Sequence, residues 1–277
     1  MIRFNSILRY PGAKWRIADF IIQHIPKHHS YLEPFFGSGA ILFRKQPSSI
    51  ETINDINSDI VNLFYVVREK ASKLAEYIAN LPYAREIYNA SLQVPISESS
   101  DIEKAVSFLI MAWQSYGARA DGANCGWKRD VVGREANYAV QNWNRLPLWI
   151  LKAQERLKQV QIEHRDALDL IKQFNHPKVL IYCDPPYLLS TRVCKTSYKY
   201  EMSDIDHEVL LDLLNQHKGP VMLSGYRNEM YDAKLKNGWN HYDTSMVITS
   251  GVKRIESLWV KSDCIQQNLF TFEYGIE

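Results

Sequence analysis

The sequence predicts an α/β protein with a doubly wound, mostly parallel sheet and an inserted, mainly helical subdomain. Two observations support this fold class. Short apolar, β-branched runs recur with helical patterns between them, which is typical of strands that alternate with helices in a parallel sheet. The rhythm breaks between residues 69 and 155, where helical patterns and one glycine-rich stretch take over. We therefore expect a main domain formed by 1–68 and 156–277, with the subdomain at 69–155.

The expected strands are short apolar runs. In chain order they cover residues 31–36, 51–55, 160–166, 178–184 and 220–226. A helical segment, 56–70, follows the second run, and the alternating runs 242–250 and 256–262 predict a terminal antiparallel hairpin. Ligands of doubly wound sheets bind outside the carboxyl ends of the strands, so the residues at those ends are candidates for a site.

The insert is expected to begin with amphipathic helices. The run 101–118 places Val106, Ile110, Trp113 and Gly117 on one helical face, and a second helical run surrounds residues 146–160. Between them lies a stretch rich in glycine and charge.

Composition excludes little. The chain has 277 residues, 23% of them charged, and a formal net charge of +2, so any basic nucleic-acid footprint must be local. No run of eighteen apolar residues and no apolar signal core occur, so we expect a cytoplasmic protein with no membrane partner. The 4 cysteines are too scattered for a metal knuckle, and "HIPKHH" (24–29) lacks acidic or cysteine neighbours, so we expect no metal.

The most informative stretch is "VLIYCDPPYLLS" (179–190). A buried strand is expected to stop at the two prolines, because proline cannot donate to a sheet ladder and disfavours helix at the preceding residue. Asp184 and Tyr187 are therefore predicted to be held rigidly at the carboxyl end of a strand.

A second landmark is "LEPFFGSGA" (32–40), with Asp55 sixteen residues after its last glycine. Two glycines after a strand allow a tight turn and a close approach to a ligand, and an acid after the next strand can bind ribose hydroxyls. The alternatives are a simple turn and a helix N-cap at Asp55. Neither a Walker phosphate loop nor a full dinucleotide fingerprint is present, which favours a ribose-containing ligand without a phosphate chain, such as S-adenosylmethionine.

At this point the motifs resemble those of the DNA adenine-N6 methyltransferases of the Dam type, the D12 class. "RYPGAKWR" (9–16), "EPFFGSG" (33–39), "ND" (54–55) and "DPPY" (184–187) match in order, and "HRDA" (164–167) and "LSGY" (223–226) resemble later family motifs. The resemblance spans nearly the whole chain. It implies a Rossmann-like methyltransferase fold, and it places the DNA-recognition domain in the insert.

The resemblance, together with the spacing argument, implies the following sites. The catalytic residues are Asp184, Pro185, Pro186 and Tyr187. The residues expected to bind S-adenosylmethionine are Tyr10, Lys14, Phe36, Gly37, Ser38, Gly39, Asp55, Asp166 and Asp184. For Lys14, a solvated lysine after a Pro-Gly turn is the alternative.

The catalytic motif has a physical rationale in this setting. An exocyclic adenine amine is a poor nucleophile because its lone pair is conjugated into the ring. Hydrogen bonds from N6–H to Asp184 and to a carbonyl of the Pro185–Pro186 stretch draw the nitrogen toward a tetrahedral state, and Tyr187 offers a face on which the flipped base can stack.

DNA reading is expected in "CGWKRDVVGREANY" (125–138), where two glycines bracket a possible turn or hairpin. A two-stranded ribbon fits the major groove, where arginine pairs with guanine and asparagine with adenine. The candidate DNA-binding residues are Arg119, Lys128, Arg129, Arg134 and Asn137, with Lys128 assigned to phosphate. A solvated surface loop is the alternative.

The sequence thus predicts site-specific methylation of adenine N6 in double-stranded DNA. Methylation of cytosine N4 or of adenine in RNA remains open, as does a nucleic-acid-binding module without catalysis. The resemblance also allows a partner restriction endonuclease that acts on the same site, as in restriction-modification systems, and it leaves the recognised sequence and the oligomeric state open.

Overall fold

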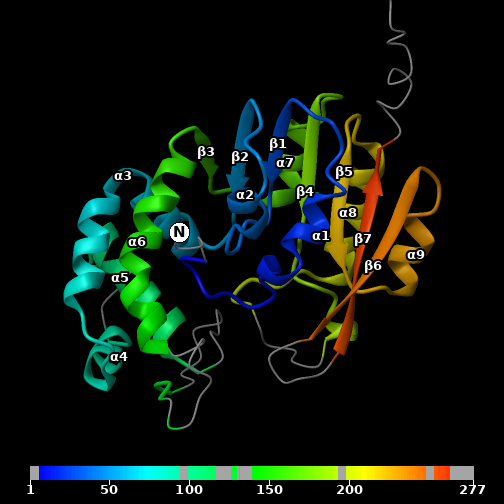
Figure 1. Ribbon diagram of the computed structural model, residues 1–277. Coiled ribbons are helices and arrows are strands. Elements are labelled where there is room, and N and C mark those ends of the chain that lie inside the picture. Colours follow the sequence, from blue (N-terminus) through cyan, green and yellow to red (C-terminus); the bar gives the residue numbers. More distant parts are fainter. Residues whose placement is uncertain are drawn as a thin grey trace, which may run out of the picture.

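The computed structural model describes residues 6–93, 99–116, 126–129, 131, 139–192, 198–247 and 253–262 (Figure 1). Of the expected DNA-binding residues, Arg119, Arg134 and Asn137 lie outside these ranges, whereas Lys128 and Arg129 lie within them.

A seven-stranded sheet forms the centre of the molecule, in the order β3-β2-β1-β4-β5-β7-β6. Its strands are β1 (Ser30–Glu33), β2 (Ile50–Asn54), β3 (Val160–Glu163), β4 (Val179–Cys183), β5 (Val221–Gly225), β6 (Trp239–Val247) and β7 (Lys253–Lys261). The first five pair in parallel, while β7 pairs antiparallel with both β5 and β6. The expected mostly parallel sheet and the terminal hairpin are both confirmed.

Strand β4 shows why the sheet is covered on both faces. Its five residues are all buried, and successive side chains point to opposite faces. Leu180 and Tyr182 join one hydrophobic core, whereas Val179, Ile181 and Cys183 join the other. An unbroken apolar run is therefore what a central parallel strand requires, because neither face meets water.

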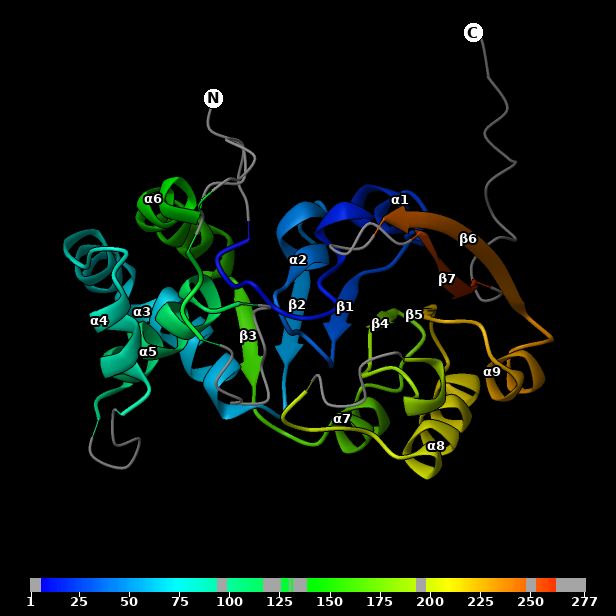
Figure 2. The same ribbon diagram turned by 90° about the horizontal axis from the view of Figure 1, so that it is seen from below.

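Helices on the two faces supply these two cores. The short helices α1 (Ala18–Ile22) and α2 (Ala40–Arg44) pack on the first face, and α7 (Ala167–Gln173), α8 (Asp204–Gln216) and α9 (Glu229–Lys234) pack on the second. Figure 2 shows these two layers on opposite sides of the strands. Two short 3₁₀ turns, η1 (Lys14–Arg16) and η3 (Leu189–Thr191), follow the proline-containing segments near the site. The doubly wound arrangement is thus confirmed.

A group of four helices, three of them long, lies at the β3 side of the sheet (Figure 1). It consists of α3 (Ser58–Asn80), α4 (Arg85–Ser91), α5 (Asp101–Gln114) and α6 (Ala139–Leu157). The expected apolar face of α5 is buried at Val106, Ile110 and Trp113. Helix α3 starts two residues later than expected, with the Asn57 side chain as its N-cap, and continues well past residue 70.

The helical group is joined firmly to the main domain. Helix α3 crosses the expected boundary at residue 69 and departs from helical geometry only at Lys70 (φ −131°, ψ 27°). The Nε1 of Trp113 in α5 donates to the Ile7 carbonyl at 2.9 Å, and Ile7 and Leu8 are fully buried. The segment that leads to Lys14 is therefore fastened to the helical group.

A second connection between the two parts is electrostatic. The guanidinium of Arg156, at the end of α6, binds both carboxylate oxygens of Glu51 in β2. Lys45 completes the cluster with an ion pair of 2.5 Å to Glu51, whose carboxylate is 3% exposed. Burial alone would raise the pKa of Glu51, but these two cations hold it below its ordinary value.

Among the described residues, none of the helices combines the length and the apolar character that crossing a membrane requires.

Candidate active site

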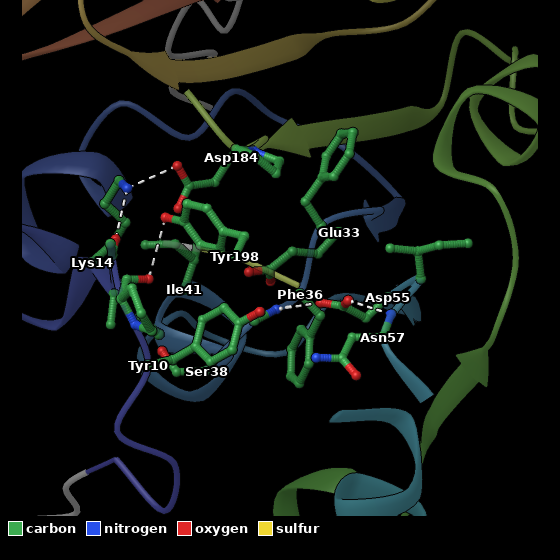
Figure 3. A pocket seen from close by; sticks show the side chains of 18 of the residues that line it. Tyr10, Lys14, Glu33, Phe36, Ser38, Ile41, Asp55, Asn57, Asp184 and Tyr198 are labelled. Atoms are coloured by element: carbon green, nitrogen blue, oxygen red, sulfur yellow. Dashed lines mark hydrogen bonds and ion pairs between the residues drawn. The ribbon is translucent and has the colours of Figure 1, made fainter. Parts of the chain in front are cut away.

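A cavity opens where the carboxyl ends of β1, β2 and β4 meet (Figure 3). Parallel pairing in register brings these ends together, since Leu32 of β1 pairs with both Thr52 and Ile181. The segments that follow the three strands, together with the N-terminal Pro-Gly turn, line the cavity. The lining residues include Tyr10, Pro11, Gly12, Lys14, Glu33, Phe36, Gly37, Ser38, Ile41, Asp55, Asn57, Tyr182, Asp184, Pro186, Tyr198 and Tyr200.

The glycine loop has the geometry that the sequence predicts. Gly37 and Gly39 adopt φ values of 51° and 68°, which favour glycine. A Cβ added to Gly39 would lie 2.3 Å from the Phe36 ring, so a side chain there would displace the aromatic residue that lines the cavity. The loop is thus built as a close-fitting wall for a ligand.

Asp55 ties this loop to the strand beside it. Its Oδ2 accepts a hydrogen bond from the Gly37 N–H at 2.9 Å, and its Oδ1 accepts one from Asn57 N–H at 2.9 Å. The N-cap of α3 is Asn57, so Asp55 is not the helix cap of the alternative interpretation. Burial raises the pKa of Asp55 to about 6, while the two N–H donors act in the opposite direction.

Lys14 is the second component of the site. Its ammonium lies 2.8 Å from Asp184 Oδ1 and donates to the Gly12 carbonyl at 2.8 Å. The side chain is 5% exposed, so the alternative of a solvated lysine is wrong. Burial alone would lower the pKa of Lys14, but the carboxylates of Asp184 and Glu256 raise it well above its ordinary value. Burial raises the pKa of Asp184, and Lys14 opposes that shift.

Tyr187 is adjacent to the cavity but is not one of its lining residues. It is 9% exposed, and the Lys14 ammonium is 4.8 Å from its ring centroid. The edge of the neighbouring Tyr226 ring packs against it, with the ring centroids 4.7 Å apart. The Tyr187 hydroxyl donates to Glu256 Oε1. The aromatic residue of the motif is therefore fixed through both its ring and its hydroxyl.

Glu256 is a component that the sequence argument missed. It is 3% exposed on β7, and its Oε1 lies 3.6 Å from the Lys14 ammonium. Burial raises its pKa, while Lys14 lowers it. The signal was present in the alternating run: Glu256 shares its strand face with Leu258 and Val260, which belong to the core, so an acid occupies a core position.

Glu33 and Tyr198 also line the cavity without having been predicted. The hydroxyl of Tyr31 donates to Glu33 Oε2 at 2.8 Å, and burial raises the pKa of Glu33 to about 8. The Tyr198 hydroxyl donates to the Pro11 carbonyl at 3.4 Å, and its ring lies 5.9 Å from that of Tyr10. Glu33 ends β1 but lay inside the predicted strand 31–36, so its available signal was its place as the first residue of the EPFFGSG motif. Tyr198 reaches the site from a distant loop.

Seven of the nine residues predicted to bind the cofactor line the cavity, and the other two, Gly39 and Asp166, do not. Gly39 stands at the start of α2, next to the lining residues. Asp166 is exposed and serves as the N-cap of α7, where its carboxylate accepts from the N–H groups of Leu168 and Asp169. Asp166 is outside the lining set, so its role toward the cofactor adenine stays a prediction. Pro185 is also outside that set, whereas Pro186 lines the cavity.

The described part of the expected DNA-reading stretch pairs with the end of α5. Trp127 forms an antiparallel bridge with Ser115, and the Lys128 N–H donates to the Gln114 carbonyl at 2.7 Å. The hydroxyls of Tyr83 and Tyr116 donate to the carbonyls of Lys128 and Arg129. The expected turn or hairpin between Gly126 and Gly133 stays a prediction, because residues 130, 132 and 133 lie outside the described ranges.

The expectation of no metal was based on the scattered cysteines and on the histidines at 24–29, which have no acidic or cysteine neighbours. The His28 Nε2 is hydrogen-bonded to Ser48 Oγ at 2.7 Å, and its Nδ1 to the Pro26 carbonyl at 2.7 Å. Within the described ranges, no three histidine, cysteine or acidic side chains gather in a way that could hold a metal ion.

Comparisons with known proteins identify relatives along most of the chain. The type II methyltransferase M.MjaIII of Methanocaldococcus jannaschii is 25% identical over 262 residues, covering 85% of this chain and 89% of its own. The DNA adenine methylase of Serratia marcescens is 25% identical over 260 residues, covering 90% and 91%. The DNA adenine methylase of Escherichia coli K12 is 23% identical over 249 residues, covering 86% and 85%.

A family model agrees with these relatives and with the site. It describes the D12 class N6 adenine-specific DNA methyltransferases, and it matches residues 10–248. That range includes the Pro-Gly turn, the glycine loop, Asp55, the helical group and the Asp-Pro-Pro-Tyr motif. The chain therefore belongs to the D12 class of N6 adenine-specific DNA methyltransferases, enzymes whose methyl donor is S-adenosylmethionine.

Proposed function

We propose that the protein methylates the N6 amine of an adenine flipped out of double-stranded DNA, at a specific sequence, and that Asp184 is the residue that binds this amine. The observation that carries the proposal is the position of Asp184. It directly follows the central strand β4, beside the glycine loop that follows β1 and Asp55 that follows β2, at the edge of the sheet where such folds bind ligands.

The cavity suits S-adenosylmethionine in charge. Of its three lining acids, Glu33 keeps its proton at neutral pH because burial raises its pKa to about 8, and Lys14 balances the charge of Asp184, so Asp55 leaves an excess of negative charge. A cavity with excess acid favours a ligand that carries positive charge, and this cofactor is cationic at its sulfonium and its amine. We assign Asp55 to the ribose hydroxyls and the Phe36–Gly39 loop to the wall against which the cofactor lies.

The protein's contribution to the chemistry is alignment and hydrogen bonding. S-adenosylmethionine, when bound, supplies a methyl group on a sulfonium, which is already a good leaving group. Asp184 accepts a hydrogen bond from N6–H, and a carbonyl of the Pro185–Pro186 stretch accepts the other. These bonds draw N6 out of conjugation and turn its lone pair toward the methyl group. The reacting atoms are thereby held in a near-attack geometry.

We further propose that Lys128 contacts DNA phosphate and that Arg129 reads a base. Arg129 is exposed, and the carbonyls of both residues are tied to tyrosine hydroxyls, so their backbone is held in place at the helical group. A backbone that is already ordered supports base reading because less conformational entropy is lost when DNA binds. Arg119, Arg134 and Asn137 keep their predicted roles as DNA-binding candidates. A restriction endonuclease that cuts the same site remains the candidate partner.

One assay tests the function and its alternatives. The protein is incubated with labelled S-adenosylmethionine and, separately, with PCR-amplified DNA, the same DNA heat-denatured, RNA transcribed from it, or bulk protein. The products are digested and the labelled residue is identified. We expect label in N6-methyladenine from the duplex, and no transfer by Asp184→Ala. Label in N4-methylcytosine, in RNA or in protein would establish one of the alternatives instead, and no transfer to any substrate would support a binding module.

A further inference from the structure

Lys14 occupies the position that the target amine needs. Its ammonium lies 2.8 Å from the carboxylate of Asp184 and 4.8 Å from the centroid of the Tyr187 ring (Figure 3 shows the ion pair). These are the two groups to which the motif assigns the adenine, one as hydrogen-bond acceptor and the other as stacking surface. A nitrogen that donates to Asp184 while lying over Tyr187 is what the flipped base would present, so the lysine and the base compete.

The displaced ammonium cannot simply be left unpaired. Lys14 is 5% exposed, and a buried cation that loses its partner is strongly destabilised. The two carboxylates that face it are Asp184 and Glu256, and the phenol of Tyr198 lies close by. Glu256 is only 3.6 Å away, and it is buried and ordered by the Tyr187 hydroxyl. A small movement of the lysine therefore exchanges one carboxylate for the other.

We propose that Glu256 is a positioning residue that receives the ammonium of Lys14 when the target amine takes its place at Asp184. Before the base arrives, Lys14 bridges the two carboxylates and fills the amine position. Once the base has entered, the lysine pairs with Glu256, and Asp184 is free to accept from N6–H. The inference rests on the proposed role of Asp184, and it assigns a function to a residue outside the catalytic motif.

The test compares Glu256→Gln with the wild-type protein. The glutamine oxygen can still accept from the Tyr187 hydroxyl, so the ring stays in place, but the neutral amide cannot neutralise Lys14. Glu208→Gln is the matched control, because Glu208 is exposed on α8. The target site is first mapped from the methylation pattern that the wild-type protein produces on PCR-amplified DNA. Two duplexes are then made, one with adenine at the target and one with purine, which lacks the amine.

Binding of each duplex is measured by fluorescence anisotropy, without turnover. We expect Glu256→Gln to raise the Kd of the adenine duplex about tenfold, since the amine must then compete with an ammonium that has no second partner. The purine duplex has no amine to place at Asp184, so its Kd should change less than about twofold, within the error of a near-neutral substitution. Glu208→Gln should leave both values unchanged, and thermal unfolding and binding of S-adenosylmethionine should confirm that Glu256→Gln is folded.

A second variant separates this role from a merely structural one. In a Lys14→Met background there is no ammonium to receive, so adding Glu256→Gln should leave the Kd of the adenine duplex unaltered. Equal losses on the adenine and purine duplexes, or losses that persist in the Lys14→Met background, would overturn the inference. A wild-type protein that methylates no adenine would instead refute the proposed function, so the two failures are distinguishable.

Discussion

At the scale of single residues, the site depends on charges that burial makes costly. Glu33, Asp55, Asp184 and Glu256 bring four acids to or beside one cavity, and Lys14 is the cation that lies among them. Such clusters are common in active sites, because burial shifts the pKa values of the acids and strengthens the electrostatic interactions between charged groups.

Replacing Asp184 by alanine should abolish methyl transfer while leaving the fold and cofactor binding largely intact. The carboxylate is expected to contact the amine directly, whereas the cofactor has other contacts along the glycine loop. Turnover measured beside calorimetric cofactor affinity checks this. Near-normal turnover would show that another group binds the amine.

Replacing Asp55 by alanine should weaken cofactor binding more than it slows transfer at saturating cofactor. Each lost charge-assisted hydrogen bond to a ribose hydroxyl should cost about 1.5–3 kcal/mol. Calorimetry gives the dissociation constant, and Asp169→Ala, an exposed substitution on α7, is the control. An unchanged dissociation constant would limit Asp55 to its structural hydrogen bonds with Gly37 and Asn57.

Glu33 should make the protein less stable as the pH rises. Burial raises the pKa of Glu33 from 4.5 to about 8, so between these values the folded protein holds a proton that the unfolded chain has released. The free energy of unfolding therefore falls as the pH rises through this window. Glu33→Gln keeps an acceptor for the Tyr31 hydroxyl and removes the titration. Urea unfolding from about pH 5 to pH 8 should show a smaller decline for the variant than for the wild-type protein; parallel curves would contradict the assignment.

The residues that sequence reasoning found and missed differ in how local their signals are. Asp184, Asp55 and the two loop glycines each follow a recognisable strand, so local pattern places them at the sheet edge. Tyr198 joins the site only through tertiary folding, and nothing near it in the chain indicates its partner Pro11. The exposed Asp166 is the N-cap of α7, and its expected role toward the cofactor adenine stays a prediction.

At the scale of elements, the sequence pattern predicted which segments are helices or strands better than it predicted where each one begins and ends. The alternating β6–β7 hairpin was readable because its period differs from that of a helix, and the all-buried β4 because it is short and two prolines soon follow it. The end of α3 was not readable, because a helix continues wherever a partner covers its apolar stripe, and here α5 and α6 provide that cover. The packing that determines the length of α3 lies far away in the sequence.

The Arg156–Glu51 pair, which connects α6 to β2, should matter for stability. Arg156→Met leaves the buried Glu51 carboxylate with Lys45 alone, and we expect a loss of about 2–3 kcal/mol in the free energy of unfolding, at the low end for a broken buried pair. The exposed pair Lys158–Glu155 supplies the control, since Lys158→Ala should cost less than about 1 kcal/mol. Urea denaturation of both variants measures the difference, and equal losses would mean that burial adds nothing to the Arg156 contact.

At the scale of the whole molecule, the proposed DNA contacts require a duplex to reach the cavity and the helical group together. Lys128→Ala should weaken binding to all DNA similarly and lower the dependence of affinity on salt. Arg129→Ala should cost about 1–3 kcal/mol, chiefly on the recognised site. Titrations of recognised and unrelated duplexes at several salt concentrations separate the two roles. If neither variant changes either affinity, the reading element lies in the flanking helices.

The hydrogen bond from Trp113 to the Ile7 carbonyl restricts how this enzyme can be re-engineered. The segment that leads to Lys14 is hydrogen-bonded to α5, so replacing the helical group would also disturb the position of Lys14. A chimaera with helices from another protein would also need a surface on those helices that accommodates Ile7 and Leu8. Without such a surface, Lys14 would lose its position in the cavity. Given the proposed DNA contacts of Lys128 and Arg129, we expect substitutions near these two residues to change sequence preference with less damage than grafting residues 69–155 as a block.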